Sequence, residues 1–201
     1  FGGHNWHPMA FSPNTGLVYI PTIHMVYPYR PDPNFKYNPG TWNTGEDWRS
    51  IGDEVPDVLP QLCSPTRLTA WNPVDQEQVW QVPFDSVVNA GVLATAGGLV
   101  FQGTSDGRLV AYADDTGEAL WSQHIGVGIM APPVTYAIDG VQYITVVAGL
   151  GGAQGAIAHK LGQANYGHVF TFALDGDATP PSLALPQRSV RVPETTLSEA
   201  S

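Results

Sequence analysis

The segment from Val92 to Trp121 constrains the fold more than any other part of the chain. Three turn signals divide it, namely Gly97-Gly98, Asp106-Gly107 and Asp114-Asp115-Thr116-Gly117. Between these turns lie runs rich in β-branched and aromatic residues, and the runs are too short and too often interrupted to form helices. The segment therefore predicts one complete unit of four antiparallel strands joined by tight turns.

A similar segment precedes this unit in the chain. Residues 68–80 align with residues 109–121, so that Ala70 corresponds to Ala111 and Trp80 to Trp121, in both cases 41 residues later. A four-stranded unit that recurs about every 40–45 residues is typical of a β-propeller blade. Because a closed propeller has about four to eight blades, a chain of 201 residues holds about half of a large one. The sequence therefore predicts an all-β partial propeller, and a piece of a longer protein.

The remaining residues divide into further strands, two loops and a tail. We expect a hairpin within residues 9–20, an incomplete blade at 66–90, a full blade at 91–124, a hairpin at 133–148 and one strand at 169–174. Residues 28–65 are rich in Pro and form a long excursion from the sheets, in which Trp42 and Trp48 are expected to cover the propeller face as a lid. Helix is expected only within 43–62 and 153–166. Residues 1–176 then make up the propeller portion, and the Pro-rich residues 177–201 a linker or tail.

The charge and the rare residue types exclude several classes of function. The net charge is −10 with only eight Lys and Arg, which disfavours binding to nucleic acid or to an anionic membrane. Cys63 is the only cysteine, so neither an internal disulfide nor a multi-thiolate metal site can form. The six histidines show no metal-ligand spacing with carboxylates, and no apolar run approaches the roughly 20 residues that span a bilayer.

Residues 111–121, AYADDTGEALW, have a clear structural logic. Small Ala111 leaves room for a neighbouring indole, Thr116-Gly117 closes a tight turn, and Trp121 can bury a large flat surface between blades. This stretch resembles the tryptophan-docking motif of the pyrroloquinoline-quinone (PQQ) dehydrogenases, the eight-bladed quinoprotein alcohol dehydrogenases. Trp121 is therefore expected to be well buried, and Trp80, whose turn departs from the motif, to dock less strongly.

Two further stretches are similar to the same family. Residues 2–10, GGHNWHPMA, resemble the segment that contributes an Asn-Trp pair beside the quinone, and residues 126–136, GVGIMAPPVTY, resemble the segment that lines the cofactor pocket. By composition alone, Asn5 and Trp6 suit a loop amide and a packing indole, and Ile129 and Met130 suit the core. The resemblance implies instead that Asn5, Trp6, Ile129 and Met130 contact the cofactor. It covers roughly residues 1–176 and is strongest to the quinohaemoprotein alcohol dehydrogenases.

The resemblance implies a periplasmic enzyme that oxidises primary alcohols to aldehydes with PQQ, while an Asp accepts the hydroxyl proton and Ca²⁺ polarises the quinone. It places that Asp and the calcium ligands upstream of Phe1, in an N-terminal half of the propeller, so no catalytic or metal-binding residue is assigned within this chain. The tail from Ala178 resembles a linker to a cytochrome c domain. Haem c is thus implied in a further domain or protein that accepts electrons. The alternative is a quinone-free propeller that acts as a scaffold or assembly module.

Overall fold

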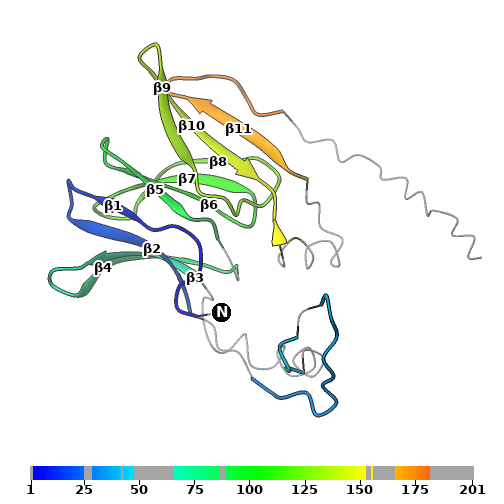
Figure 1. Cartoon of the computed structure of the whole chain (residues 1–201). Helices are drawn as coiled ribbons and strands as arrows, with labels where there is room; N and C mark the ends of the chain where they lie inside the picture. The colour runs from blue at the N-terminus through cyan, green and yellow to red at the C-terminus, as the bar shows by residue number, and fades with distance from the viewer. Residues whose placement is uncertain are drawn as a thin grey trace, which may run out of the picture.

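The structure is a computed structural model, and it describes residues 2–24, 29–41, 43–47, 66–86, 89–152, 155 and 166–181. Eleven β-strands lie in the described residues, arranged as three antiparallel sheets that stack side by side (Figure 1). The all-β partial propeller predicted from the sequence is therefore confirmed. The strands are β1 Ala10–Ser12, β2 Leu17–Ile23, β3 Thr66–Asn72, β4 Glu77–Phe84, β5 Val92–Thr95, β6 Leu99–Gly103, β7 Arg108–Ala113, β8 Ala119–His124, β9 Val134–Ile138, β10 Val141–Ala148 and β11 His168–Ala173.

The first sheet has the order β1-β2-β3-β4. Strand β2 pairs with β3 from Val18 to Ile23, with Tyr19 opposite Ala70, so the N-terminal hairpin and residues 66–84 form a single blade. Residues 66–90 supply only two strands, as expected of an incomplete blade, but the sequence did not reveal that the N-terminal hairpin completes it. Its two missing strands lie before the long excursion, and this separation along the chain concealed the pairing.

The second sheet has the order β5-β6-β7-β8 and is the full blade expected from residues 92–121. The third sheet has the order β11-β10-β9, because the strand at 168–173 pairs with the hairpin at 134–148 along β10. It contains three strands in the part of the chain that the structure describes. Its last strand in chain order is therefore β11, the third strand, whereas each of the other two sheets ends with a fourth strand.

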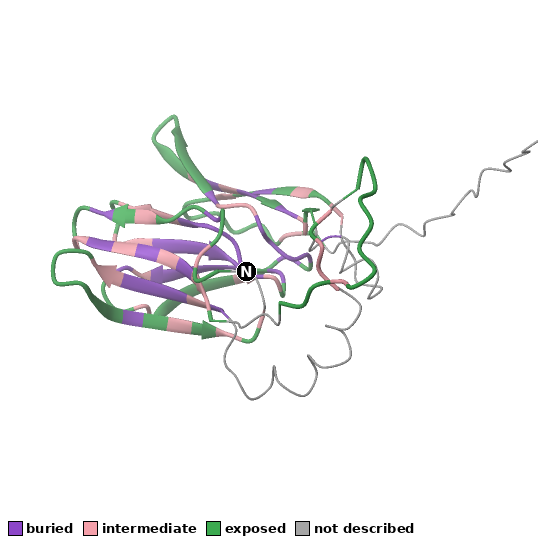
Figure 2. Ribbon diagram, turned by 60° about the horizontal axis from the view of Figure 1, so that its bottom comes forward, coloured by how far each residue is buried: buried purple, intermediate pink, exposed green. Residues whose placement is uncertain are grey.

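Two hydrophobic clusters hold the three sheets together (Figure 2). Alternation along β7 explains both clusters, because Val110 and Tyr112 face the first sheet while Leu109 and Ala111 face the third. On the first sheet the cluster includes Leu17, Tyr19, Leu68, Ala70 and Trp80, and on the third sheet Ile144, Val146, Ala148 and Phe170. The middle sheet is therefore buried on both faces, and each outer sheet is packed on one.

Trp80 connects a strand of the first blade to a turn of the second. Its side chain is 8% exposed and stacks on Tyr19, with ring centroids 5.6 Å apart. The indole lies against Gly117, where a Cβ atom would be 2.6 Å from the ring, and Nε1–H donates to the carbonyl of Asp114 at 3.1 Å. Gly117 has φ +75°, a conformation that favours glycine in any case. Trp80 thus meets the Thr-Gly turn of the second blade as a docked tryptophan.

Trp121 is less buried than the sequence predicts. Its side chain is 40% exposed, and it meets the edge of Phe172 with the ring centroids 5.5 Å apart. The expected ranking of the two tryptophans is therefore reversed. The cause lies in the neighbours: Trp80 packs on a complete four-stranded blade, whereas Trp121 lies on β8, opposite a sheet whose outermost described strand is β11.

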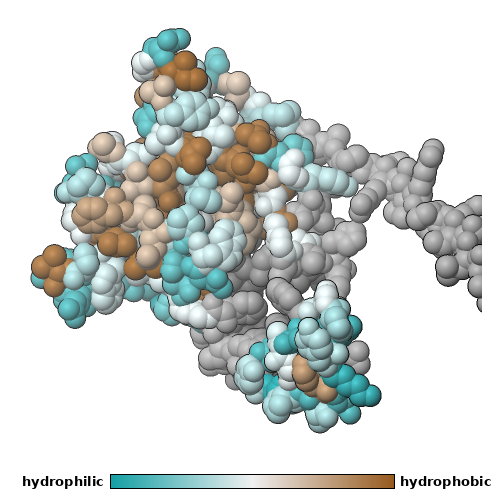
Figure 3. Space-filling view, viewed as in Figure 1, coloured by the Kyte–Doolittle hydropathy of each residue, from teal (hydrophilic) through white to brown (hydrophobic). Residues whose placement is uncertain are grey.

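The outer face of the third sheet carries apolar side chains that are exposed. Pairing within the sheet places alternate residues of its strands on this face, and they include Val134, Tyr136, Ile138, Val141, Val147 and Val169. Figure 3 shows apolar side chains at the surface in this region of the molecule. Clustered apolar surface of this kind marks a contact site or an association hazard.

Several expectations fall outside the described residues. Trp42, Trp48 and Cys63 are among them, as are most of residues 153–166, where helix was expected, and residues 182–201 of the tail. The described parts of the excursion, residues 29–41 and 43–47, contain one isolated bridge, between Pro31 and Glu46, and lie apart from the three sheets in Figure 1. Within the described ranges no helix is long and apolar enough to cross a bilayer.

Candidate functional site at one end of the sheets

The connections at one end of the sheets contain every residue that the sequence singled out for cofactor contact. In an antiparallel meander, successive connections alternate between the two ends of the strands. One end has the short turns at 13–16, 73–76, 96–98, 114–117 and 139–140. The other end has residues 2–9, 85–91, 104–107 and 125–133, together with the two long connections at 24–65 and 149–167. Long connections at one end of a rigid scaffold are where binding sites usually form.

The segment around Asn5 and Trp6 is fixed on both sides. The carbonyl of Gly3 accepts a hydrogen bond from the N–H of Ile23 at 2.9 Å, and His4 Nδ1 lies 2.9 Å from the carbonyl of Pro21. These two bonds hold the segment to β2 of the first sheet. Asn5 and Trp6 follow directly, so their backbone is anchored at its start.

The other anchor of this segment is on the second sheet. The carbonyl of Pro8 accepts a hydrogen bond from the N–H of Val92 at 3.0 Å. The Pro8 ring lies so close to Gly91 that a Cβ atom there would be 2.4 Å from Pro8 Cδ. Asn5 and Trp6 therefore sit in a short bridge between the first two blades.

The side chains of Asn5 and Trp6 have defined surroundings. Asn5 Oδ1 accepts the N–H of Trp6 at 2.8 Å, which fixes the orientation of the Asn5 amide. The Trp6 indole is 65% exposed, and its ring stacks on that of His7 with the centroids 4.2 Å apart and an interplanar angle of 24°. One face of the indole is thus covered by protein, and a flat aromatic surface remains open to a ligand.

Ile129 and Met130 are both buried, at the junction of the second and third sheets. Ile129 is fully buried, and its N–H donates to the carbonyl of Thr104 at 2.9 Å. It forms bridges to Ala148 and Gly149, and its side chain fills the space at Gly103, where a Cβ atom would be 2.2 Å from Ile129 Cγ2. The amide of Ile129 is therefore already bonded within the protein, which narrows its expected role to shaping the site by packing.

The four predicted site residues thus lie at the same end of the sheets but at two different junctions. Contacts run between them through the second blade, from Pro8 to Gly91, from Ala90 to Gly103, and from Gly103 to Ile129. The structure brings the two segments onto one continuous surface of inter-blade contacts. Asn5 and Trp6 are exposed to solvent there, whereas Ile129 is buried between the second and third sheets.

A buried polar network at the junction of the first two blades was not predicted. Asn89 Nδ2 donates to Thr66 Oγ1 at 2.8 Å, Thr66 Oγ1 donates to the carbonyl of Ser86 at 2.8 Å, and Ser86 Oγ donates to Asn89 Oδ1 at 2.9 Å. The N–H of Ser105 also donates to Asn89 Oδ1, at 3.3 Å. These residues lie in loops or at strand ends with no motif around them, so the sequence carried no signal for the network.

His7 lies beside this network and also has no motif. Its side chain is only 4% exposed. Burial lowers the pKa of His7 from its ordinary value, and the neighbouring His4 lowers it further. The imidazole is therefore neutral at pH 7. The described residues contain no cluster of three or more His, Cys, Asp or Glu that could hold a metal ion.

Comparison with known proteins shows which protein domains the middle of the chain resembles. Residues 65–144 match the family of PQQ β-propeller domains of glucose, ethanol and alcohol dehydrogenases. The matched residues cover β3 to β9 and the first half of β10, which includes the whole second blade and both docking motifs. This part of the chain thus matches the sequence of PQQ-type β-propeller domains.

Individual relatives of the chain are named as quinohemoprotein alcohol dehydrogenases and as a cytochrome c-linked 1-butanol dehydrogenase. Over 90% of this chain, the sequence is 43% identical to the quinohemoprotein alcohol dehydrogenase of Comamonas testosteroni. Over 89% of this chain, it is 41% identical to the 1-butanol dehydrogenase (cytochrome c) of Thauera butanivorans. The solved structure of the alcohol dehydrogenase ADHIIG of Pseudomonas putida superimposes with a TM-score of 0.75 at 41% identity over 91% of the chain. The chain spans about a quarter of the length of these relatives, 26% of each sequence and 28% of the solved chain.

Proposed function

We propose that this chain is the C-terminal propeller portion of a periplasmic PQQ-dependent dehydrogenase that oxidises primary alcohols to aldehydes. In this proposal it contributes one wall of the quinone site. The observation that carries the proposal is the bridge of residues 3–8, anchored on two blades, which presents an open indole at the end of the sheets that also bears the long connections.

The residues present fit one side of a planar quinone. The exposed Trp6 indole offers a flat surface for stacking, and Asn5 is held beside it by the hydrogen bond to the Trp6 N–H. PQQ would supply the two-electron acceptor chemistry when bound, and the task of this chain would be to position it and to exclude water. Trp6 and Asn5 would hold the cofactor, while buried Ile129 and Met130 would support the shape of the pocket from the next junction.

The remaining parts of the site belong to other segments in this proposal. The resemblance places the proton-accepting Asp and the ligands of Ca²⁺ in an N-terminal half of the propeller, which would pack against this chain. A cytochrome c domain or protein, with haem c, would accept the electrons. A relative named as a cytochrome c-linked 1-butanol dehydrogenase supports both the substrate class and this acceptor.

The test uses the complete dehydrogenase that carries this chain, with Asn5→Ala and Trp6→Ala measured for PQQ affinity and for turnover with ethanol and 1-butanol. We expect each substitution to weaken PQQ binding by about tenfold or more, as for loss of one good polar or stacking contact. Asn14→Ala is the matched control, because Asn14 lies in a turn at the opposite end and also makes a single side-chain hydrogen bond, to the carbonyl of Ala96.

Two results would contradict the proposal. If Asn14→Ala impaired PQQ binding as much as Asn5→Ala, the effect would be one of stability and not of the site. If the complete protein bound no PQQ at all, the quinone-free scaffold would become the better interpretation.

A further inference from the structure

His7 forms the floor on which the exposed indole of Trp6 lies. The two rings are stacked with their centroids 4.2 Å apart, yet Trp6 is 65% exposed and His7 only 4%. Whatever fixes the plane of the imidazole therefore also fixes the plane of the indole. The residue after His7 is Pro8, which is anchored on the second blade, so the backbone cannot easily compensate for a rotated ring.

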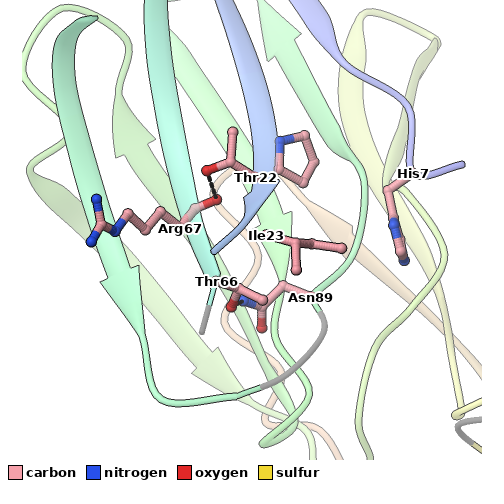
Figure 4. Close-up of a pocket in the computed structure, with 7 residues that line it drawn as sticks. His7, Thr22, Ile23, Thr66, Arg67 and Asn89 are labelled. Atoms are coloured by element: carbon pink, nitrogen blue, oxygen red, sulfur yellow. Dashed lines mark hydrogen bonds between the residues drawn. The ribbon is translucent and has the colours of Figure 1, made fainter. Parts of the chain in front are cut away.

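His7 lines a small pocket at the junction of the first two blades (Figure 4). The other lining residues are Pro21, Thr22, Ile23, Thr66, Arg67 and Asn89. The Ile23 side chain points toward His7, whereas the guanidinium of Arg67 is directed away and bonds Gln81 Oε1 at 3.0 Å. The pocket has room for about one water molecule.

Three buried polar atoms in or near this pocket have no hydrogen-bond partner among the described residues. Nε2 of His7 and Nε of Arg67 belong to lining residues, and the third is Oε1 of Gln102, a side chain that is fully buried. Gln102 belongs to the same junction, because its Nε2 donates to the carbonyl of Ala90, the residue after Asn89. Leaving such atoms unpaired is costly, and a buried water usually satisfies them.

We infer that His7 is a positioning residue for Trp6, held in place by one buried water molecule that bonds His7 Nε2 within the junction of the first two blades. The pocket, the orphaned Nε2 and the ring stack together carry this inference. Burial keeps the pKa of His7 low, so the imidazole stays neutral and can either donate to or accept from such a water. The inference rests on the proposed function only in that Trp6 is the residue that meets the quinone.

The first test is a crystal structure of the complete dehydrogenase at a resolution that shows ordered water. We expect one water molecule within hydrogen-bond distance of His7 Nε2 and of a second polar atom of the junction. A direct bond from His7 Nε2 to a protein atom, or a dry pocket, would overturn the inference whatever the protein binds elsewhere.

The second test compares His7→Phe with His124→Phe in the same protein. His7→Phe keeps an aromatic ring under Trp6 but removes Nε2, and His124 is an exposed histidine on β8 that does not line the pocket. We expect His7→Phe to weaken PQQ binding by about tenfold with little change in the melting temperature of the apoprotein, because the water bond is lost and the ring can rotate. His124→Phe should leave both quantities unchanged.

The outcomes separate this inference from the proposed function. If Trp6→Ala weakens PQQ binding and His7→Phe does not, the quinone site stands and the role of His7 is refuted. If Trp6→Ala has no effect on PQQ binding, the proposed quinone contact is wrong. In that case the crystallographic water alone decides whether His7 holds the indole in place.

Discussion

Replacing Trp80 with Ala is the sharpest test of how the blades are held together. The side chain is only 8% exposed, stacks on Tyr19, and donates a hydrogen bond to the carbonyl of Asp114. Burying a Trp removes about 200 Å² from water, worth about 5 kcal/mol at roughly 25 cal/mol per Å². Partial relaxation reduces the observed cost, so we expect Trp80→Ala to lower the free energy of unfolding by about 3–5 kcal/mol.

Trp121→Ala is the matched comparison, since Trp121 occupies the corresponding position of the next motif. Its side chain is 40% exposed, and its one described ring contact is with the edge of Phe172, so the cost should be smaller, about 2–3 kcal/mol. The assay is urea unfolding of the chain followed by circular dichroism at one fixed protein concentration, with an unchanged m-value. A cost for Trp121→Ala equal to or above that for Trp80→Ala would refute the reasoning.

The glycine against which Trp80 packs gives an independent check. Gly117→Ala would place a Cβ atom 2.6 Å from the indole, whereas Gly140→Ala, at a nearly identical φ of +81°, meets nothing within 4 Å. Both substitutions introduce backbone strain of about 1 kcal/mol, and Gly117→Ala should cost a further 1–3 kcal/mol or so from overpacking. Equal costs would show that Trp80 does not pack on this turn.

Three further outcomes are expected. Tyr19→Phe should lower the free energy of unfolding by about 1 kcal/mol, because it removes the buried hydrogen bond of the Tyr19 hydroxyl to the carbonyl of Asp114 and leaves that ring in place; urea unfolding measures it. Burial raises the pKa of Tyr112 to about 12. The neutral phenol therefore contributes fully to the free energy of unfolding below about pH 10, and this contribution is lost as the pH rises toward 12. Unfolding at stepped alkaline pH should show the decline, and Tyr112→Phe should make the decline smaller. The 201-residue chain alone, supplied with PQQ and Ca²⁺, should oxidise no alcohol in a dye-reduction assay. It should also self-associate through the apolar face of the third sheet, which light scattering would detect. Turnover by a monodisperse monomer would contradict both expectations.

The sequence by itself determined the local features of the fold. The turns of residues 92–121 and the 41-residue recurrence predicted a four-stranded blade correctly, because Gly-containing turns and alternating apolar residues act over a few positions. The segments around Asn5 and Met130 could likewise be singled out from their sequence, and they lie at one end of the sheets. Whether they contact a quinone stays a prediction.

Only the tertiary structure decided how distant segments combine. The pairing of β2 with β3 depends on contacts across the long connection at 24–65, which no local pattern encodes. The degree of burial of Trp80 and Trp121 depends on what the neighbouring sheet supplies, so two copies of one motif differ. His7 is buried for the same reason: the polarity of a side chain is a property of its residue type, but its exposure is set by the two blades that close around it.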